Sequence, residues 1–122
     1  MNSNFIWLIT KKMRKITEIM SECFRHWEEK SLSNTIVKYD DKWRMTRMFL
    51  HWNEIATLDD MGVLKLDNCG WKTNTTKERL NWILDIFDLW HIFQKKFEWF
   101  YMNKNWKVVP MNEEITLSIY DN

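Results

Sequence analysis

Apolar residues between positions 13 and 27 recur at steps of three and four, which is the spacing of one face of an α-helix. These apolar positions are Met13, Ile16, Met20, Cys23, Phe24 and Trp27. Charged residues take the opposite side, at Arg14, Glu18, Glu22 and Arg25. Their spacing also allows ion pairs along the helix surface. We therefore predict an amphipathic helix from about residue 5 to residue 30, with 13–30 as its regular part.

The first twelve residues precede this stripe and contain the apolar run FIWLI at 5–9. Five apolar residues are too few for a signal-peptide core or a membrane span. The sequence therefore favours a soluble, intracellular product with no membrane segment. A second methionine stands at position 13. Residues 1–12 are a possible N-terminal extension, and both Met1 and Met13 are candidate starts.

After residue 34 the pattern changes to short segments rich in β-branched and aromatic residues. Four such segments cover 35–39, 43–52, 54–58 and 63–67. Because turn-forming residues separate them, we predict an antiparallel β-meander over 35–67. Neither alternating face of the second segment is fully polar. That strand is expected to be central in the sheet, or to be covered by a helix on one face and by a partner on the other.

A second helix is predicted over 75–89. Thr75 followed three residues later by Glu78 matches a capping box, in which each side chain bonds the other residue's backbone N–H. A core-facing stripe follows at Leu80, Ile83, Leu84 and Phe87. Trp82 lies on an adjacent flank and widens the apolar arc.

Residues 90–120 predict two further hairpins. The first pairs 90–94 with 98–102, and the second pairs 106–109 with 115–120. Pro110 should end a strand or lie at a sheet edge, since proline cannot donate to a ladder. The expected fold is a single α+β domain over 1–122: an N-terminal amphipathic helix, a β-meander, a capped central helix and C-terminal β-hairpins.

Composition adds constraints on the turns and on the thiols. The chain has two glycines and one proline, so we expect Asn and Asp to form most turns and to take left-handed positions. The formal charge of +1 favours no class of charged partner. Cys23 and Cys69 fit no metal-binding spacing, and we expect reduced thiols, with a disulfide as the alternative.

The sequence gives no support for catalysis, for a metal or for a cofactor. His26 follows Cys23 by three residues, while His51 and His91 stand by themselves. A zinc site needs about four converging ligands. Two glycines cannot supply a phosphate-binding loop, and no serine has the flanking glycines of a nucleophile elbow.

Basic residues lie among aromatic residues toward the C-terminal end. Lys95 and Lys96 precede Phe97 and Trp99, and a second basic cluster, KKMRK, covers 11–15. A single-stranded nucleic acid needs such a mixture because its phosphates pair with cations and its bases stack on rings. The alternative is that Trp99 faces the core and that the lysines protect a strand edge from aggregation.

The surplus of aromatic residues favours protein binding. Nine Trp, seven Phe and three Tyr are difficult to bury in 122 residues, and rings that remain at a surface commonly anchor interfaces. We select Trp7 and Trp82 as candidate exposed anchors. The alternative is that they close the rim of the core. FIWLI and the broad apolar arc of the second helix also favour a homodimer.

Residues 51–84 read HWNEIATLDDMGVLKLDNCGWKTNTTKERLNWIL, and FQKKFEWFY follows at 93–101. Through a motif Gly-Trp-x-Thr-x-Thr-Thr-x-x-Arg-Leu-Asn, the chain resembles a family of small uncharacterised bacteriophage proteins over about 13–112. The matching residues are Ile55, Ala56, Gly70, Trp71, Thr73, Thr75, Thr76, Arg79, Leu80, Asn81, Gln94, Lys95 and Trp99. The resemblance implies a compact α+β domain made by a phage or a related mobile element, and it implies no activity.

Arg79 and Asn81 are not required for helix initiation or core packing, so they join the candidate contact residues. The predicted partner-binding residues are Trp7, Arg79, Asn81, Trp82, Lys95, Lys96 and Trp99. We expect a non-enzymatic phage accessory protein that binds a host protein or ribonucleoprotein complex in the host cytoplasm. By analogy with other small phage proteins it would inhibit a host defence complex, in an anti-CRISPR-like or anti-restriction-like manner. The alternative is a single-stranded nucleic-acid-binding protein.

Overall fold

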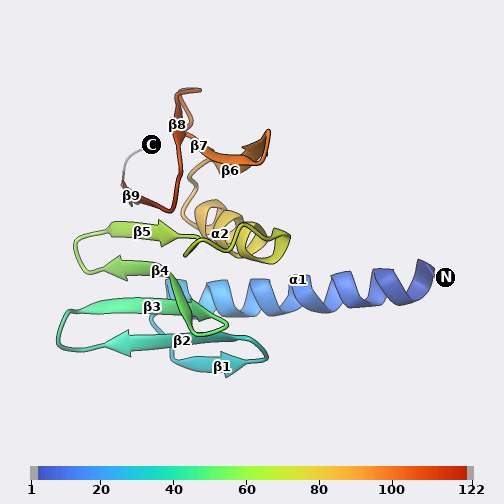
Figure 1. Cartoon of the computed structure of the whole chain (residues 1–122). Coiled ribbons are helices and arrows are strands. Elements are labelled where there is room, and N and C mark those ends of the chain that lie inside the picture. The colour runs from blue at the N-terminus through green and yellow to red at the C-terminus, as the bar shows by residue number, and fades with distance from the viewer. Residues whose placement is uncertain (1–2, 121–122) are drawn as a thin grey trace.

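A computed structural model describes residues 3–120, and the side chains of residue 12 and residues 14–120. It confirms the α+β class and the order of elements (Figure 1). The elements are α1 (Ser3–Arg25), β1 (Lys30–Leu32), β2 (Thr35–Asp40), β3 (Met45–Leu50), β4 (Asn53–Asp59), β5 (Val63–Asp67), α2 (Asn74–Ile86), β6 (His91–Lys95), β7 (Glu98–Met102), β8 (Val108–Pro110) and β9 (Glu114–Ser118).

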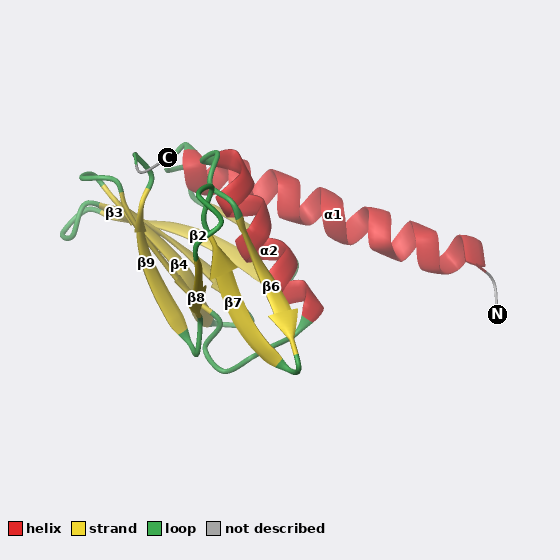
Figure 2. Cartoon of the chain, turned by 90° about the horizontal axis from the view of Figure 1, so that it is seen from above, coloured by secondary structure: helices red, strands yellow, loops and turns green. Residues whose placement is uncertain are grey.

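The strands form a six-stranded sheet with the order β1-β2-β3-β4-β5-β9 and a three-stranded sheet with the order β6-β7-β8. All neighbouring strands are antiparallel. α1 contacts β1, β2 and β3, whereas α2 contacts β4 and also β6 of the smaller sheet. Both helices therefore cover the larger sheet, with α2 lying beside β6 as well (Figure 2). The core lies between these layers.

The apolar stripe of α1 packs as the spacing predicts, with Met20, Cys23 and Phe24 buried. The helix ends earlier than predicted, at Arg25 rather than near residue 30. Trp27 adopts a left-handed φ of 59°, and the N–H of Glu28 donates to the carbonyl of Cys23 at 2.9 Å. This is the hydrogen bond of a Schellman termination. The chain then turns back into β1, which the sequence did not predict.

The central position predicted for the strand at 43–52 is confirmed, because β3 lies between β2 and β4. Its buried face carries Thr46, Met48 and Leu50. Where β3 pairs with β4, the register shifts between Met48 and Phe49. This irregularity leaves both Ile55 and Ala56 buried, although alternate residues of a regular strand face opposite sides.

The second predicted hairpin, 106–109 with 115–120, is wrong. β8 pairs with β7 in the smaller sheet, whereas β9 pairs with β5 in the larger one. Between them Met111 is fully buried, and the N–H of Asn68 donates to the carbonyl of Glu113 at 2.9 Å. The segment after Pro110 therefore crosses from one sheet to the other.

The left-handed turn positions are not taken by Asn and Asp as expected. Ten non-glycine residues within 3–120 have a positive φ, and only Asp88 among them is Asn or Asp. Asn and Asp serve the turns through their side chains instead. Asp59 accepts from the backbone N–H groups of Met61 and Val63, and Asn103 accepts from those of Asn105 and Lys107.

The predicted cap of α2 is also wrong by two residues. The helix begins at Asn74, and Thr73 is the N-cap, since its hydroxyl accepts from the N–H of Thr76 at 3.2 Å. Glu78 does not reach back to close a capping box with Thr75. Its carboxylate accepts a hydrogen bond from the Thr17 hydroxyl of α1 at 2.8 Å. A tertiary contact has thus replaced the local one.

Replacing the true cap should destabilise the protein, whereas the predicted one should matter little. Thr73→Ala is expected to lower the free energy of unfolding by about 1 kcal/mol, because the N–H of Thr76 loses its acceptor. Thr75→Ala should stay within about 0.5 kcal/mol of the parent. Urea unfolding measures both, and equal losses in the two variants would contradict the assignment of the cap.

Two hairpins turn through two residues that both have positive φ. These are His51–Trp52 between β3 and β4, and Lys96–Phe97 between β6 and β7. Such turns favour Asn-Gly because a Cβ atom strains left-handed backbone. Trp52→Gly should therefore exceed Trp52→Ala in stability by about 1 kcal/mol, and Phe97→Gly should exceed Phe97→Ala by a similar amount. Both alanine variants are controls, because they remove the ring and keep a Cβ atom on the left-handed backbone. Equal stability of the alanine and glycine variants in thermal unfolding would contradict the presence of backbone strain.

Candidate binding surfaces

Arg79 is buried, with 1% of its surface exposed, at the junction of α1, α2 and β2. Its guanidinium donates to the hydroxyl of Thr17 on α1, and to the hydroxyl of Thr35 on β2 at 3.3 Å. The side-chain oxygen of Asn34 accepts at 3.4 Å, and the Glu78 carboxylate lies 3.8 Å away. Burial lowers the pKa of Arg79, and Glu78 opposes that effect. These contacts give Arg79 a structural role and leave it no surface for a partner.

Asn81 binds the backbone of the smaller sheet. Its side-chain oxygen accepts from the N–H of Ile92 at 2.7 Å, and its amide donates to the carbonyl of Ile92 at 3.0 Å. The side-chain amide therefore pairs with the start of β6 as the backbone of a neighbouring strand would. Arg79 and Asn81 thus connect α2 to its neighbours on two sides.

Asn81→Ala should lower the free energy of unfolding by about 1–3 kcal/mol, because both backbone groups of Ile92 lose their partners. Asp85→Ala is the matched control, since Asp85 is exposed on the same helix. It should change stability by less than about 0.5 kcal/mol. If chemical denaturation found Asn81→Ala as stable as this control, a stabilising role for the Asn81–Ile92 hydrogen bonds would be ruled out.

The other predicted contact residues differ in how exposed their side chains are. Trp99 is buried on β7, and the ammonium of Lys77 lies 6.0 Å from the centre of its ring. Trp82 is half-buried on α2, whereas Lys95 and Lys96 are exposed at the β6–β7 turn. Trp7 lies outside the side chains that the structure describes. Contact with a partner at Trp82, Lys95 and Lys96 stays a prediction, as does the homodimer.

The aromatic rings that are most exposed lie in turns that the sequence reasoning did not select. Among the described side chains, the rings at least 60% exposed are Trp43, Trp52, Trp71, Phe97, Trp106 and Tyr120. Trp52 and Phe97 are the extremes, at 83% and 86%. Short gaps between strand segments could have indicated these positions, since a residue at the tip of a two-residue turn projects away from the sheet.

One group of exposed side chains, most of them apolar, lies where the β2–β3 turn, the β4–β5 turn and the C-terminal turn meet. We call Trp43, Arg44, Met61 and Tyr120 the Trp43 end. Arg44 forms an ion pair with Asp60 at 3.8 Å, and the N–H of Asp60 donates to the carbonyl of Arg44. The ring of Tyr120 lies so close to Gly62 that a Cβ atom there would stand 2.4 Å from it. Three turns are thus held together at this end.

A second group lies at the opposite strand ends, around the start of α2. We call Trp52, Trp71, Phe97 and the lysines 72, 77, 95 and 96 the Trp71 end. A mainly apolar cavity of about 510 Å³ opens here between the β3–β4 turn and the first turn of α2. It is lined by Leu50, His51, Asn53, Ile55, Asn68, Trp71, Thr73, Thr75 and Thr76. Lys77 also donates to Gln94 at 3.5 Å, which places the end of β6 beside α2.

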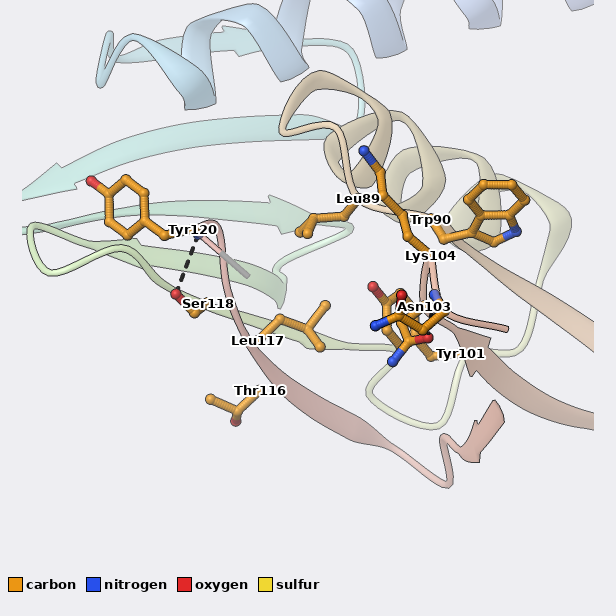
Figure 3. A pocket seen from close by; sticks show the side chains of 10 residues that line it. Leu89, Trp90, Tyr101, Asn103, Lys104, Thr116, Leu117, Ser118 and Tyr120 are labelled. Carbon is orange, nitrogen blue, oxygen red and sulfur yellow. Dashed lines mark hydrogen bonds between the residues drawn. The ribbon is translucent and has the colours of Figure 1, made fainter. Parts of the chain in front are cut away.

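A second hollow, of about 650 Å³, lies along the seam between the two sheets (Figure 3). Leu89, Trp90 and Tyr101 line one side, and Thr116, Leu117 and Ser118 of β9 line the other. Burial raises the pKa of Tyr101, while a hydrogen bond from the Trp90 backbone opposes the shift. Among the described residues, the seam is lined by no carboxylate and no histidine, and its ionisable side chains are Tyr101, Lys104 and Tyr120.

The described side chains show neither a metal-binding cluster nor an activated thiol. They include no group of three His, Cys, Asp or Glu placed to hold a metal ion. Cys23 and Cys69 form no disulfide. Burial is the main cause that raises the pKa of each thiol, which leaves weak nucleophiles at neutral pH. Within residues 3–120, no helix has the length and apolar character needed to cross a bilayer.

The fold and its surface define a small α+β protein in which helices cover one face of a six-stranded antiparallel sheet and aromatic rings project from the turns. Residues 13–118 match the Kyanoviridae Gp96 protein family. The chain belongs to this family of bacteriophage proteins, which confirms the expected phage origin. No curated protein and no solved structure matches the chain.

Proposed function

We propose that this phage protein acts by binding a macromolecule rather than by catalysis, and that its partner is a host protein or ribonucleoprotein complex in the host cytoplasm. The observation that carries the proposal is the pair of exposed rings at the Trp43 end, with Trp43 and Tyr120 each at least 60% exposed. Water does not solvate large apolar rings well, and Trp and Tyr are the residues that most often anchor interfaces.

The Trp43 end has the composition of a protein interface. Aromatic residues, Met and Arg are enriched at such interfaces, and here Trp43, Met61, Tyr120 and Arg44 stand together. Their charged neighbours Asp41, Lys42, Arg44 and Asp60 balance one another. A surface with balanced charge and projecting rings fits a protein partner better than a polyanion.

The backbone also holds Trp43 in position before any partner arrives. The carboxylate of Asp40 accepts from the N–H of Trp43 at 3.2 Å, and Arg47 donates to the same carboxylate. The hydrogen bond from Trp43, together with Arg47, lowers the pKa of Asp40. A ring on a fixed turn loses less conformational entropy on binding than a ring on a mobile one.

The finer proposal is that docking inhibits a host defence complex in an anti-CRISPR-like or anti-restriction-like manner. Its support is the phage family together with a surface suited to stoichiometric docking. It predicts that expression of the protein in a defended host raises the plaquing efficiency of a sensitive phage. A variant with Trp43→Ala and Met61→Ala should lose this effect.

Binding is tested by capture from a nuclease-treated host lysate. The wild-type protein should retain a host protein in stoichiometric amount. Trp43→Ala with Met61→Ala should reduce that amount at least tenfold, because interface anchors contribute about 2 kcal/mol or more each. Trp106→Ala is the matched control, with a ring of similar exposure elsewhere. Recovery of no protein partner by the wild type would refute the proposal.

A further inference from the structure

We infer that the Trp71 end is a second binding surface, and that its ligand is a single-stranded nucleic acid. Two features of this end suit an unpaired strand. Its exposed rings offer faces on which bases can stack, and its lysines offer cations for the phosphates between them. The Trp71 end is separate from the Trp43 end, and a nucleic acid is a different class of partner from the protein proposed there.

The rings come from three different turns that surround the start of α2. Trp52 lies in the β3–β4 turn, Trp71 in the loop before α2, and Phe97 in the β6–β7 turn. The cavity beside α2 joins the first two, since His51 and Trp71 both line it. The hydrogen bond between Lys77 and Gln94 joins the third. Figure 1 shows these strand ends and the first turn of α2 on the same side of the molecule.

The lysines at this end have no carboxylate partner, a property that they share with Lys30, Lys38, Lys42 and Lys107 among the described residues. Within the described residues, no ion pair within 4.0 Å involves any of the lysines 72, 77, 95 and 96. By contrast, Arg44, Lys65 and Lys104 each lie against an Asp or Glu. Unpaired cations are available to phosphates without first breaking an ion pair.

Three of the acidic groups nearby are already engaged, and within the described residues Glu98 is not. Glu114 pairs with Lys65 at 3.0 Å, and Glu54 pairs with Arg47 at 2.9 Å. Asp67 accepts from the N–H of Cys69. Glu98 is exposed opposite Lys95 in the hairpin. On α1, Lys12, Arg14 and Lys15 are also exposed. Positive charge therefore gathers at this end of a chain whose formal net charge is only +1.

The cavity offers a place for one base. Trp71 forms one wall, Leu50 and Ile55 lie deeper, and Asn53 and Asn68 bring amide groups to the lining. A volume of about 510 Å³ exceeds what a single base requires, and apolar walls with a few polar groups are typical of small-ligand sites. A base inserted here would stack against Trp71, which Lys72 follows directly in the chain.

Strain in the turns supports retention of the rings for binding. Trp52 and Phe97 have φ values of 69° and 67° and are also the most exposed rings described. Glycine would relieve the backbone at both positions, and a polar residue would solvate better. A side chain that is unfavourable on both counts is expected where a ligand uses it.

Fluorescence anisotropy with labelled 12-nucleotide single strands, as DNA and as RNA of one sequence, tests the inference on the purified chain. We expect a Kd of about 1–100 µM for at least one strand at physiological salt. If four lysines meet phosphates, the logarithm of the binding constant should fall with the logarithm of salt with a slope of about −3. A duplex of the same sequence should bind at least tenfold more weakly.

Two pairs of variants locate the site. Trp52→Ala with Trp71→Ala should weaken binding about 5- to 150-fold per ring, whereas Trp43→Ala with Trp106→Ala should change it less than threefold. Changing lysines 72, 77, 95 and 96 to Ala should abolish most of the salt dependence. Changing lysines 30, 38, 42 and 107 to Ala alters the net charge equally and should leave the slope near −3. Circular dichroism checks that every variant is folded.

Absence of single-strand binding at low salt, equal binding of the duplex, or equal losses in the matched variants would each overturn the inference. These outcomes would leave protein docking at the Trp43 end intact, because the oligonucleotide assay contains no protein partner. Conversely, a lysate that yields no protein partner would not affect the oligonucleotide result.

Discussion

The guanidinium of Arg79 is a positive charge buried between α1, α2 and β2, and the position of α2 follows from it. Removing such a charge from water costs several kcal/mol unless hydrogen bonds and a counter-charge offset the loss. Thr17, Thr35 and Glu78 supply them, so α1 and β2 must meet α2 at one point along its length. Asn81 lies two residues later, and its side chain forms two hydrogen bonds with the backbone of Ile92 in β6. These two side chains thus fix α2 between the larger sheet and the smaller one.

Fixing α2 also brings together turns that are distant in sequence. Once Arg79 and Asn81 are satisfied, the β3–β4 turn, the loop before α2 and the β6–β7 turn surround the first residues of the helix. The exposed rings at this end are therefore placed by a polar interaction in the interior and not by contacts among themselves. Stability and surface chemistry are separable here. The buried residues hold the helices and sheets together, whereas residues such as Trp52 and Phe97 only occupy the turns.

The parts of the fold that depend on local periodicity could be predicted from the sequence, and the parts that depend on distant partners could not. The stripe of α1 and the central place of β3 follow from spacing. The pairing of β9 with β5 requires Met111 to be buried across the molecule, and no local pattern reports that. Thr73 rather than Thr75 caps α2 because Glu78 bonds α1 instead. For the surface, the excess of rings was foreseeable. Their positions were not, since tryptophan at a left-handed turn contradicts ordinary turn preferences.

The central claim is that rings at the turns around α2 remain exposed because a ligand uses them, while the interior holds the frame. The most direct measurement is a nitrogen-15 NMR titration of the indole N–H signals with a single-stranded 12-mer. The account predicts large shifts for Trp52 and Trp71, and little change for Trp43, Trp106 and buried Trp99. Equal shifts at all indoles, or shifts confined to Trp43 and Trp106, would contradict it.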